Sequence, residues 1–199
     1  MDRYLYNPIH KDVTRKMVIL TGPRQVGKTW LAKELIKAFT RPQYLNYDNV
    51  EDARIIRNQT WSTNANFLVL DEVHKMTGWK GFVKGIYDTR PEGQSILITG
   101  SARLDTFRQT GESLAGRYFS YRLHPISVRE MRDIMPPSEA LSSLNRLGGF
   151  PEPFLSASET EAARWRKQYY TDLIREDILE FSRIHEIKAI RLIVELLRE

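Results

Sequence analysis

Residues 22–29 read G-P-R-Q-V-G-K-T, from Gly22 to Thr29, and this stretch decides the fold because of what stands on either side of it. The apolar run of residues 17–20 precedes it, and a segment with helical spacing of apolar residues follows it. A glycine-rich turn that joins a strand to a helix is the usual context of a phosphate-binding P-loop. The stretch therefore predicts a bound nucleotide.

Each residue type in this loop has a chemical reason. Gly22 and Gly27 allow backbone angles and a close approach that a Cβ would block, so successive N–H groups can converge on phosphate oxygens. Lys28 is expected to reach the β and γ phosphates of ATP, and the Thr29 hydroxyl to ligate Mg²⁺. The positive end of the dipole of the helix that begins at Lys28 attracts the same anion. The predicted nucleotide contacts are Gly22, Pro23, Arg24, Gln25, Val26, Gly27, Lys28, Thr29 and Trp30.

The composition of the 199 residues is that of a globular protein, with 41% hydrophobic and 28% charged residues. The chain has no cysteine, which excludes a disulfide framework and a thiolate metal site. No apolar run approaches the roughly 18 residues of a membrane span, and the N-terminus lacks the apolar core of a signal peptide. We therefore expect a soluble, cytoplasmic protein with no membrane partner.

The net charge of +5 raises the question of a nucleic-acid partner. The basic surplus lies within the first 158 residues, where a polyphosphate ligand would account for part of it. Residues 164–170 interleave cations with aromatic rings, a pattern that single-stranded nucleic acids exploit. At helical spacing, however, Trp165 and Tyr169 share one face, so the sequence favours an amphipathic packing helix there.

Apolar runs and helical patterns alternate along the first part of the chain. This alternation is typical of a parallel sheet with crossover helices. It predicts an α/β P-loop domain over residues 1–126, with a five-stranded, mostly parallel sheet flanked by helices. A small all-helical region is predicted over residues 127–199, with a rigid turn at residues 148–153. The predicted strands are residues 17–21, 43–47, 67–70, 95–99 and 118–123.

The second half of the site is predicted at Asp71 and Glu72, which follow the apolar run of residues 67–70. Open α/β sheets bind ligands at the carboxyl ends of their strands. There Asp71 would hold Mg²⁺ through water, and Glu72 would activate the attacking water as general base. The alternative is a strand that ends in an acidic helix cap.

Three further residues are catalytic candidates. Ser101 follows the predicted strand 95–99 and would bond the attacking water or the γ phosphate. The alternative role, a cap on the next helix, is compatible with this one. Charge that develops on a transferred phosphoryl group is commonly met by an arginine. Arg117 is the first choice and Arg103 the second, although a solvated or structurally paired arginine is an open alternative for both. The sequence leaves open whether the arginine acts within its own chain or on a neighbouring subunit.

Together these motifs resemble the AAA-like ATPases of bacteria and archaea that carry a domain of unknown function behind the ATPase core. The resemblance implies a five-stranded core that uses a catalytic glutamate, followed by helices and then a winged-helix-like segment. It rests on G-P-R-Q-V-G-K-T-W at 22–30, L-V-L-D-E-V-H-K at 68–75, T-G-S-A-R at 99–103, S-L-A-G-R at 113–117, L-H-P-I-S at 123–127 and G-G-F-P-E-P at 148–153.

A last helical pattern, residues 187–197, runs to the end of the chain without a stop signal, so we expect the chain to be part of a longer protein. The predicted function is Mg-dependent ATP hydrolysis that drives or gates a partner. A nucleotide-gated binding module with little hydrolysis is the alternative. A homo-oligomer, and a DNA or protein partner bound through the missing region, stay open.

Overall fold

The computed structural model describes residues 3–101 and 114–173 of the chain. The chain forms two compact units, Met1–Pro137 and Ser138–Glu199, which are described separately. The first unit extends past residue 126, where the sequence predicts the domain boundary, and it includes the short helix α6 (Val128–Met131). Within the described ranges, no helix is long and apolar enough to span a membrane.

A five-stranded sheet forms the centre of the first unit. Its strands are β1 (Met17–Thr21), β2 (Pro42–Asn46), β3 (Phe67–Asp71), β4 (Ser95–Thr99) and β5 (Tyr118–Arg122). Their order is β2-β3-β4-β1-β5 and all four pairings are parallel, which confirms the predicted α/β class. Every residue of β1, β3 and β4 is buried, because helices cover both faces of a parallel sheet. The edge strands β2 and β5 are more exposed.

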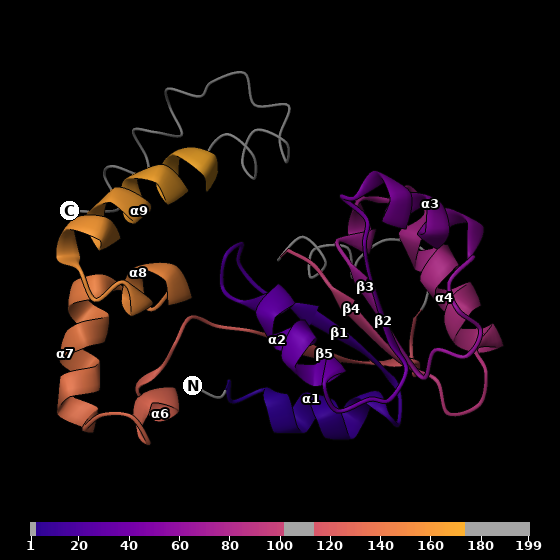
Figure 1. Cartoon of the computed structure of the whole chain (residues 1–199), viewed down its shortest axis with the longest axis horizontal. Helices are drawn as coiled ribbons and strands as arrows, with labels where there is room; N and C mark the ends of the chain where they lie inside the picture. Colours follow the sequence, from indigo (N-terminus) through magenta and orange to yellow (C-terminus); the bar gives the residue numbers. More distant parts are fainter. Residues whose placement is uncertain (1–2, 102–113, 174–199) are drawn as a thin grey trace. The chain divides into compact units, whose positions relative to one another are not determined.

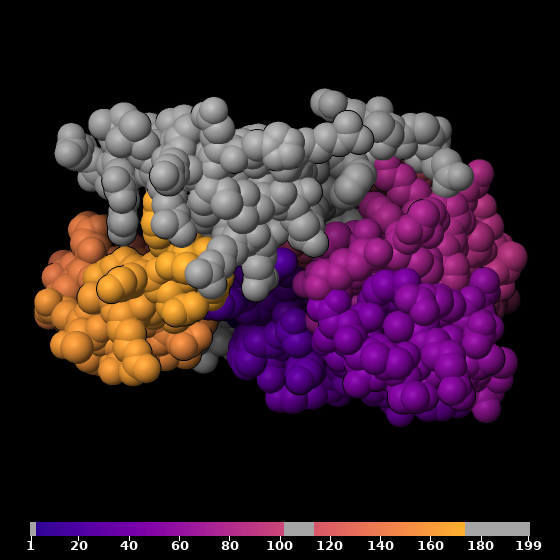
Figure 2. All heavy atoms as spheres, turned by 90° about the horizontal axis from the view of Figure 1, so that it is seen from above, coloured from indigo at the N-terminus to yellow at the C-terminus, as the bar shows by residue number. Residues whose placement is uncertain are grey.

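Helices α1 (Tyr6–Val13) and α2 (Lys28–Ile36) lie on one side of this sheet (Figure 1). Helices α3 (Val50–Asn58) and α4 (Trp79–Thr89) lie on the other side, and Figure 2 shows their atoms next to one another on the surface. No helix is predicted from the sequence at α1. Its apolar signal is short, since α1 buries only Ile9 and Val13.

The strand register brings the functional segments to one edge of the sheet. Leu20 of β1 is level with Thr99 of β4, and Thr99 is level with Asp71 of β3. Because the strands are parallel, the residues that follow each of them emerge at the same carboxyl edge. The P-loop, the acidic pair and Ser101 therefore meet there, as ligand sites of open α/β sheets require.

In the second unit, α8 (Pro151–Leu155) and α9 (Glu159–Asp172) follow α7 (Pro137–Leu147). The predicted turn at 148–153 is shorter than expected, because α8 already begins at Pro151, and proline suits the first position of a helix. Trp165 and Tyr169 share a face of α9, with ring centroids 4.6 Å apart, and both rings contact Phe150. The predicted helix at 187–197 lies outside the described residues.

Candidate nucleotide-binding site

The loop between β1 and α2 has the backbone of a P-loop, and Gly22 is required there for a reason that comes from its tertiary contacts. Its φ is +152°, and a Cβ at this position would lie 2.5 Å from the carbonyl oxygen of Leu123. Gln25 and Gly27 also have positive φ, of 60° and 100°. At Gly22 the loop therefore packs tightly against the segment that follows β5. Helix α2 then begins at Lys28.

Lys28 and Thr29 present the two polar groups that a nucleotide phosphate and its metal would use. The Lys28 ammonium is buried and donates to the carbonyl oxygens of Gly22, at 3.0 Å, and Pro23, at 2.7 Å. Thr29 is exposed, and its hydroxyl donates to Oδ2 of Asp71 at 2.9 Å. Two motifs that are 42 residues apart in the sequence therefore meet in one hydrogen bond.

Asp71 is almost fully buried at the end of β3 and accepts hydrogen bonds from three hydroxyl groups. Thr99 donates to Oδ1, while Thr29 and Tyr44 both donate to Oδ2, the latter at 2.6 Å. Burial, and then the nearby Asp71 carboxylate, raise the pKa of Tyr44, so its hydroxyl keeps its proton. Tyr44 is not singled out by the sequence, because its contact with Asp71 depends on the pairing of β2 with β3.

Glu72 follows Asp71 in the left-handed backbone region, with a φ of 57°, and is partly buried. Burial, followed by repulsion from Asp71, raises the pKa of Glu72 above its ordinary value. The buried His74 has Nε2 3.5 Å from Oε2 of Glu72 and 3.3 Å from Oγ of Ser101. His74 therefore lies between two predicted catalytic residues. Its place in the motif D-E-V-H-K was visible in the sequence, but its role there was not.

Arg117 lies at the opposite edge of the sheet. It precedes β5, whose first residue Tyr118 is level with Met17 at the start of β1. The P-loop follows the other end of β1, about 15 Å away at the rise of a β-strand. The Arg117 guanidinium forms an ion pair with Asp88, with Nε 2.8 Å from Oδ1. Arg117 is therefore too far from the P-loop of its own chain to contact a nucleotide there. Arg103 lies outside the described residues.

The exposure of Val26 and of Trp30 determines which of their atoms a nucleotide at the P-loop can contact. Val26 is fully buried, so its side chain is part of the core and only its backbone faces the loop. Trp30 on α2 is 46% exposed and lines a surface pocket of about 350 Å³ together with Glu34 and Lys37. The roles of Pro23, Arg24 and Gln25 in nucleotide binding stay predictions.

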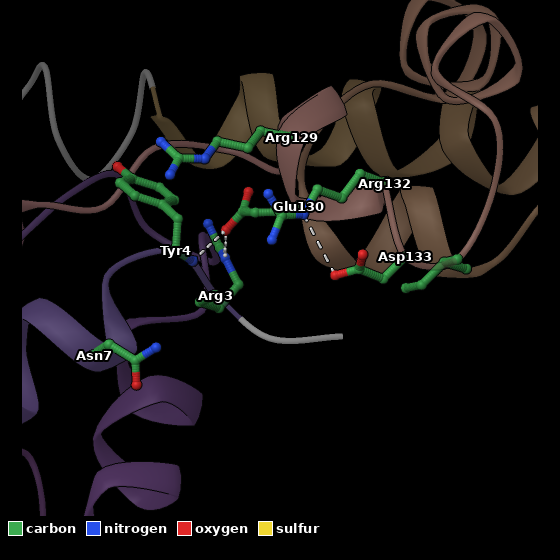
Figure 3. Close-up of a pocket in the computed structure, with 8 residues that line it drawn as sticks. Arg3, Tyr4, Asn7, Arg129, Glu130, Arg132 and Asp133 are labelled. Carbon is green, nitrogen blue, oxygen red and sulfur yellow. Dashed lines mark hydrogen bonds and ion pairs between the residues drawn. The ribbon is translucent and has the colours of Figure 1, made fainter.

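A buried ion pair that no sequence motif reveals contacts the backbone of the P-loop. The guanidinium of Arg3 donates to Oε1 of Glu130 at 2.7 Å and to the carbonyl oxygen of Val26 at 2.8 Å. The Glu130 carboxylate points at Arg3 and at the backbone nitrogen of Tyr4 (Figure 3). Arg3, Tyr4 and Glu130 line a pocket of about 420 Å³ whose other lining residues are Asn7, Arg129, Arg132, Asp133 and Ile134.

The donor set at the carboxyl edge fits magnesium. Mg²⁺ prefers oxygen ligands, and proteins usually hold it with one or two carboxylates together with the phosphates of a substrate. Asp71 and the Thr29 hydroxyl supply such oxygens. The described part of the chain contains no group of three or more His, Cys, Asp or Glu residues that would make a metal site by itself.

Comparison with protein families agrees with this geometry. Residues 14–132 match the family described as an AAA domain. Residues 138–199 match a domain of unknown function, DUF8612. The second match begins at the first residue of the second compact unit.

Similar sequences come from archaea and bacteria. The uncharacterized protein MJ1544 of Methanocaldococcus jannaschii is 26% identical over 94% of this chain, which covers 47% of MJ1544. The uncharacterized protein Rv2008c of Mycobacterium tuberculosis is 28% identical over 83% of this chain, which covers 37% of Rv2008c. The chain thus spans less than half the length of these relatives.

One solved structure with a similar fold is the RuvB Holliday junction branch migration motor of Thermotoga maritima. It is 18% identical with a TM-score of 0.47, over 76% of this chain and 57% of RuvB. At that TM-score, the comparison gives no information about this chain beyond its own sheet topology.

Proposed function

The chain belongs to the AAA domain family, and from this premise we propose that it binds Mg-ATP at the P-loop and hydrolyses it to drive or gate a partner. The observation that carries the proposal is the hydrogen bond from Thr29 to Asp71. It joins the P-loop to the acidic end of β3, so that phosphate, metal and nucleophile would share one edge of the sheet.

In the proposed reaction, the backbone N–H groups of the P-loop bind the phosphates, and Lys28 exchanges its carbonyl partners for phosphate oxygens. Thr29 would hold Mg²⁺ directly and Asp71 would hold it through a bound water, and the metal would supply positive charge at the β and γ phosphates. Glu72 accepts a proton from the attacking water, and a raised pKa makes it a better base once it is ionised. His74 and Ser101 hold Glu72 and the water in place.

We propose that the catalytic arginine comes from a second copy of the chain. Arg117 is at the amino edge of the sheet, whereas the nucleotide would bind at the carboxyl edge. A copy whose amino edge faces the P-loop of its neighbour would bring Arg117 to the γ phosphate, after release from Asp88. This supports a homo-oligomer as the active form. Arg103 stays an alternative for the same role.

A nucleotide-gated binding module is the second candidate, because the pairing of Arg117 with Asp88 supports it. If Arg117 stays in this ion pair, ATP would bind and set the conformation while hydrolysis stays slow. Multiple turnovers by the purified chain, at a protein concentration at which it assembles, would eliminate this candidate. Tight Mg-ATP binding with no turnover at any protein concentration would eliminate the hydrolase.

The test of the hydrolase compares the parent with Glu72→Gln and with Glu34→Gln as a matched control. Glu34 is an acid on α2 that pairs with Lys37 at the surface. We expect Glu72→Gln to bind Mg-ATP as the parent does and to lose about 100-fold or more in kcat, as removal of a general base does. Glu34→Gln should keep the parent rate. Equal kcat for Glu72→Gln and the parent would refute the assignment of Glu72.

The predicted partner is DNA or a protein. The chain covers 47% of MJ1544 and 37% of Rv2008c, and we propose that this partner binds through the part of such proteins that lies outside the matched region. The absence of cysteine supports a cytoplasmic location.

A further inference from the structure

Tyr44 contacts Asp71, the carboxylate that the proposed function assigns to the metal. It lies on β2, two positions before Asn46, which is the residue level with Asp71 in the register of β2 with β3. Its phenol oxygen nevertheless lies 2.6 Å from Oδ2 of Asp71. A residue from a third strand therefore contacts the carboxylate that the proposed function assigns to the metal.

The register explains why tyrosine reaches this carboxylate. Tyr44 is level with Val69, and Val69 and Asp71 share one face of β3 because they are two residues apart. Tyr44 therefore projects from the same face as Asp71, at a distance of two residues along the strand, about 6 to 7 Å. A long side chain such as tyrosine spans this distance. The ammonium of Lys33 on α2 lies 5.8 Å from the centre of the Tyr44 ring on this face.

The hydrogen bonds of Asp71 leave little freedom to its carboxylate. A carboxylate has about four acceptor positions, two on each oxygen. Thr29 and Tyr44 take both positions on Oδ2, and Thr99 takes one on Oδ1. The three donors come from α2, β2 and β4, so the carboxylate is held from three sides. With respect to the described residues, 3–101 and 114–173, one acceptor position remains, and it is on Oδ1.

We propose that Tyr44 is a positioning residue that holds the Asp71 carboxylate so that its remaining acceptor position, on Oδ1, receives a magnesium-bound water. This inference rests on the proposed Mg-ATP site. Without the phenol, the carboxylate can turn about its Cβ–Cγ bond, and Thr29 alone holds Oδ2. Residues that orient metal ligands in this way typically change metal affinity by about 10- to 100-fold when they are replaced.

The test replaces Tyr44 by Phe, which removes only the hydroxyl group, and measures two affinities on the full chain. The first is the affinity for a fluorescent ATP analogue in EDTA. The second is the affinity of the protein–ATP complex for Mn²⁺, a spectroscopic substitute for Mg²⁺, measured by electron paramagnetic resonance. We expect the first to stay within about twofold of the parent and the second to fall by about 10-fold or more.

Tyr47→Phe is the matched control, because Tyr47 follows β2 and its hydroxyl accepts from Arg57 instead of contacting Asp71. Both affinities should stay at parent values in this variant. An unchanged or tighter Mn²⁺ affinity in Tyr44→Phe would overturn the positioning role. So would an equal loss in EDTA and with Mn²⁺, which would indicate a general structural defect. A parent chain that binds no ATP in either condition would instead overturn the proposed function, and this inference with it.

Discussion

Replacement of Glu130 by Ala should destabilise the first unit strongly. The side chains of Glu130 and Arg3 are each only 1% exposed. The Glu130 carboxylate accepts from Nε of Arg3 at 2.7 Å, from the backbone nitrogens of Tyr4 and Ser127 at 3.1 and 2.9 Å, and from Oγ of Ser127 at 3.1 Å. Removal of one partner of a buried ion pair leaves an uncompensated charge and typically costs about 3 to 5 kcal/mol.

A loss of this size is a large part of the free energy of unfolding of a typical domain, which is about 5 to 15 kcal/mol. It can be measured by urea denaturation in a Trp165→Phe background. The chain has four tryptophans, and the other three, at positions 30, 61 and 79, lie in the first unit. Tryptophan fluorescence then reports on the first unit alone.

Glu34→Ala is the control for this experiment, since its ion pair with Lys37 is at the surface and its removal should change stability by less than about 0.5 kcal/mol. A double-mutant cycle with Arg3→Met and Glu130→Leu should give a coupling energy of about 2 kcal/mol. A loss below about 1 kcal/mol for Glu130→Ala, or a coupling energy near zero, would refute the view that this pair supports the P-loop.

Three further perturbations test the site. Gly22→Ala should lower the free energy of unfolding by about 2 kcal/mol or more, because the added Cβ would overlap a backbone carbonyl. Gly93→Ala should lower it by about 1 kcal/mol, because Gly93 also has a positive φ but an added Cβ would have no atom within 4 Å. Equal losses in the two variants would contradict the overlap. Arg117→Ala and Lys28→Ala should each abolish ATP turnover alone. A mixture of the two variants should recover activity, because the intact Arg117 of one copy can then act at the intact P-loop of another. No recovery would contradict the proposal that Arg117 acts on a neighbouring copy. Because the pKa of Glu72 is raised in the fold, its contribution to stability is present below its ordinary pKa and is lost as pH rises through the raised value. The stability of Glu72→Gln relative to the parent, measured in EDTA without nucleotide, should therefore rise from pH 4 to pH 7, and a decrease would contradict the assigned pKa shift.

Much of the fold was predictable because its signals are local. The five apolar runs are each contiguous, and all five observed strands agree with the predicted ones to within one residue at either end, with β1 and β4 identical. α1 was missed because it buries only two apolar side chains. The predicted turn runs to residue 153, but helix α8 already begins at Pro151. Proline suits both a turn and the first position of a helix, so the sequence does not distinguish the two.

In the candidate site, the residues of short motifs were predicted from the sequence, but the contacts between distant residues were not. Lys28, Thr29, Asp71 and Glu72 were predicted because each stands in a short motif whose chemistry depends on neighbouring residues. His74 was written in the same motif as Glu72, but its position beside Ser101 depends on the placement of β4 next to β3. Motifs therefore predict which chemical groups are present, and strand order decides which of them touch.

By itself, the sequence determined that this chain has a P-loop, an acidic pair behind a buried strand and an α/β alternation to carry them, because each of these is encoded in consecutive residues. Only the tertiary structure decided that Tyr44 reaches Asp71, that Gly22 packs against the carbonyl of Leu123 and that Arg117 lies at the opposite edge from the P-loop. The first two contacts join residues that are 27 and 101 positions apart. They depend on the order and register of parallel strands, which arise when the whole sheet packs between its helices and are not written in any one segment.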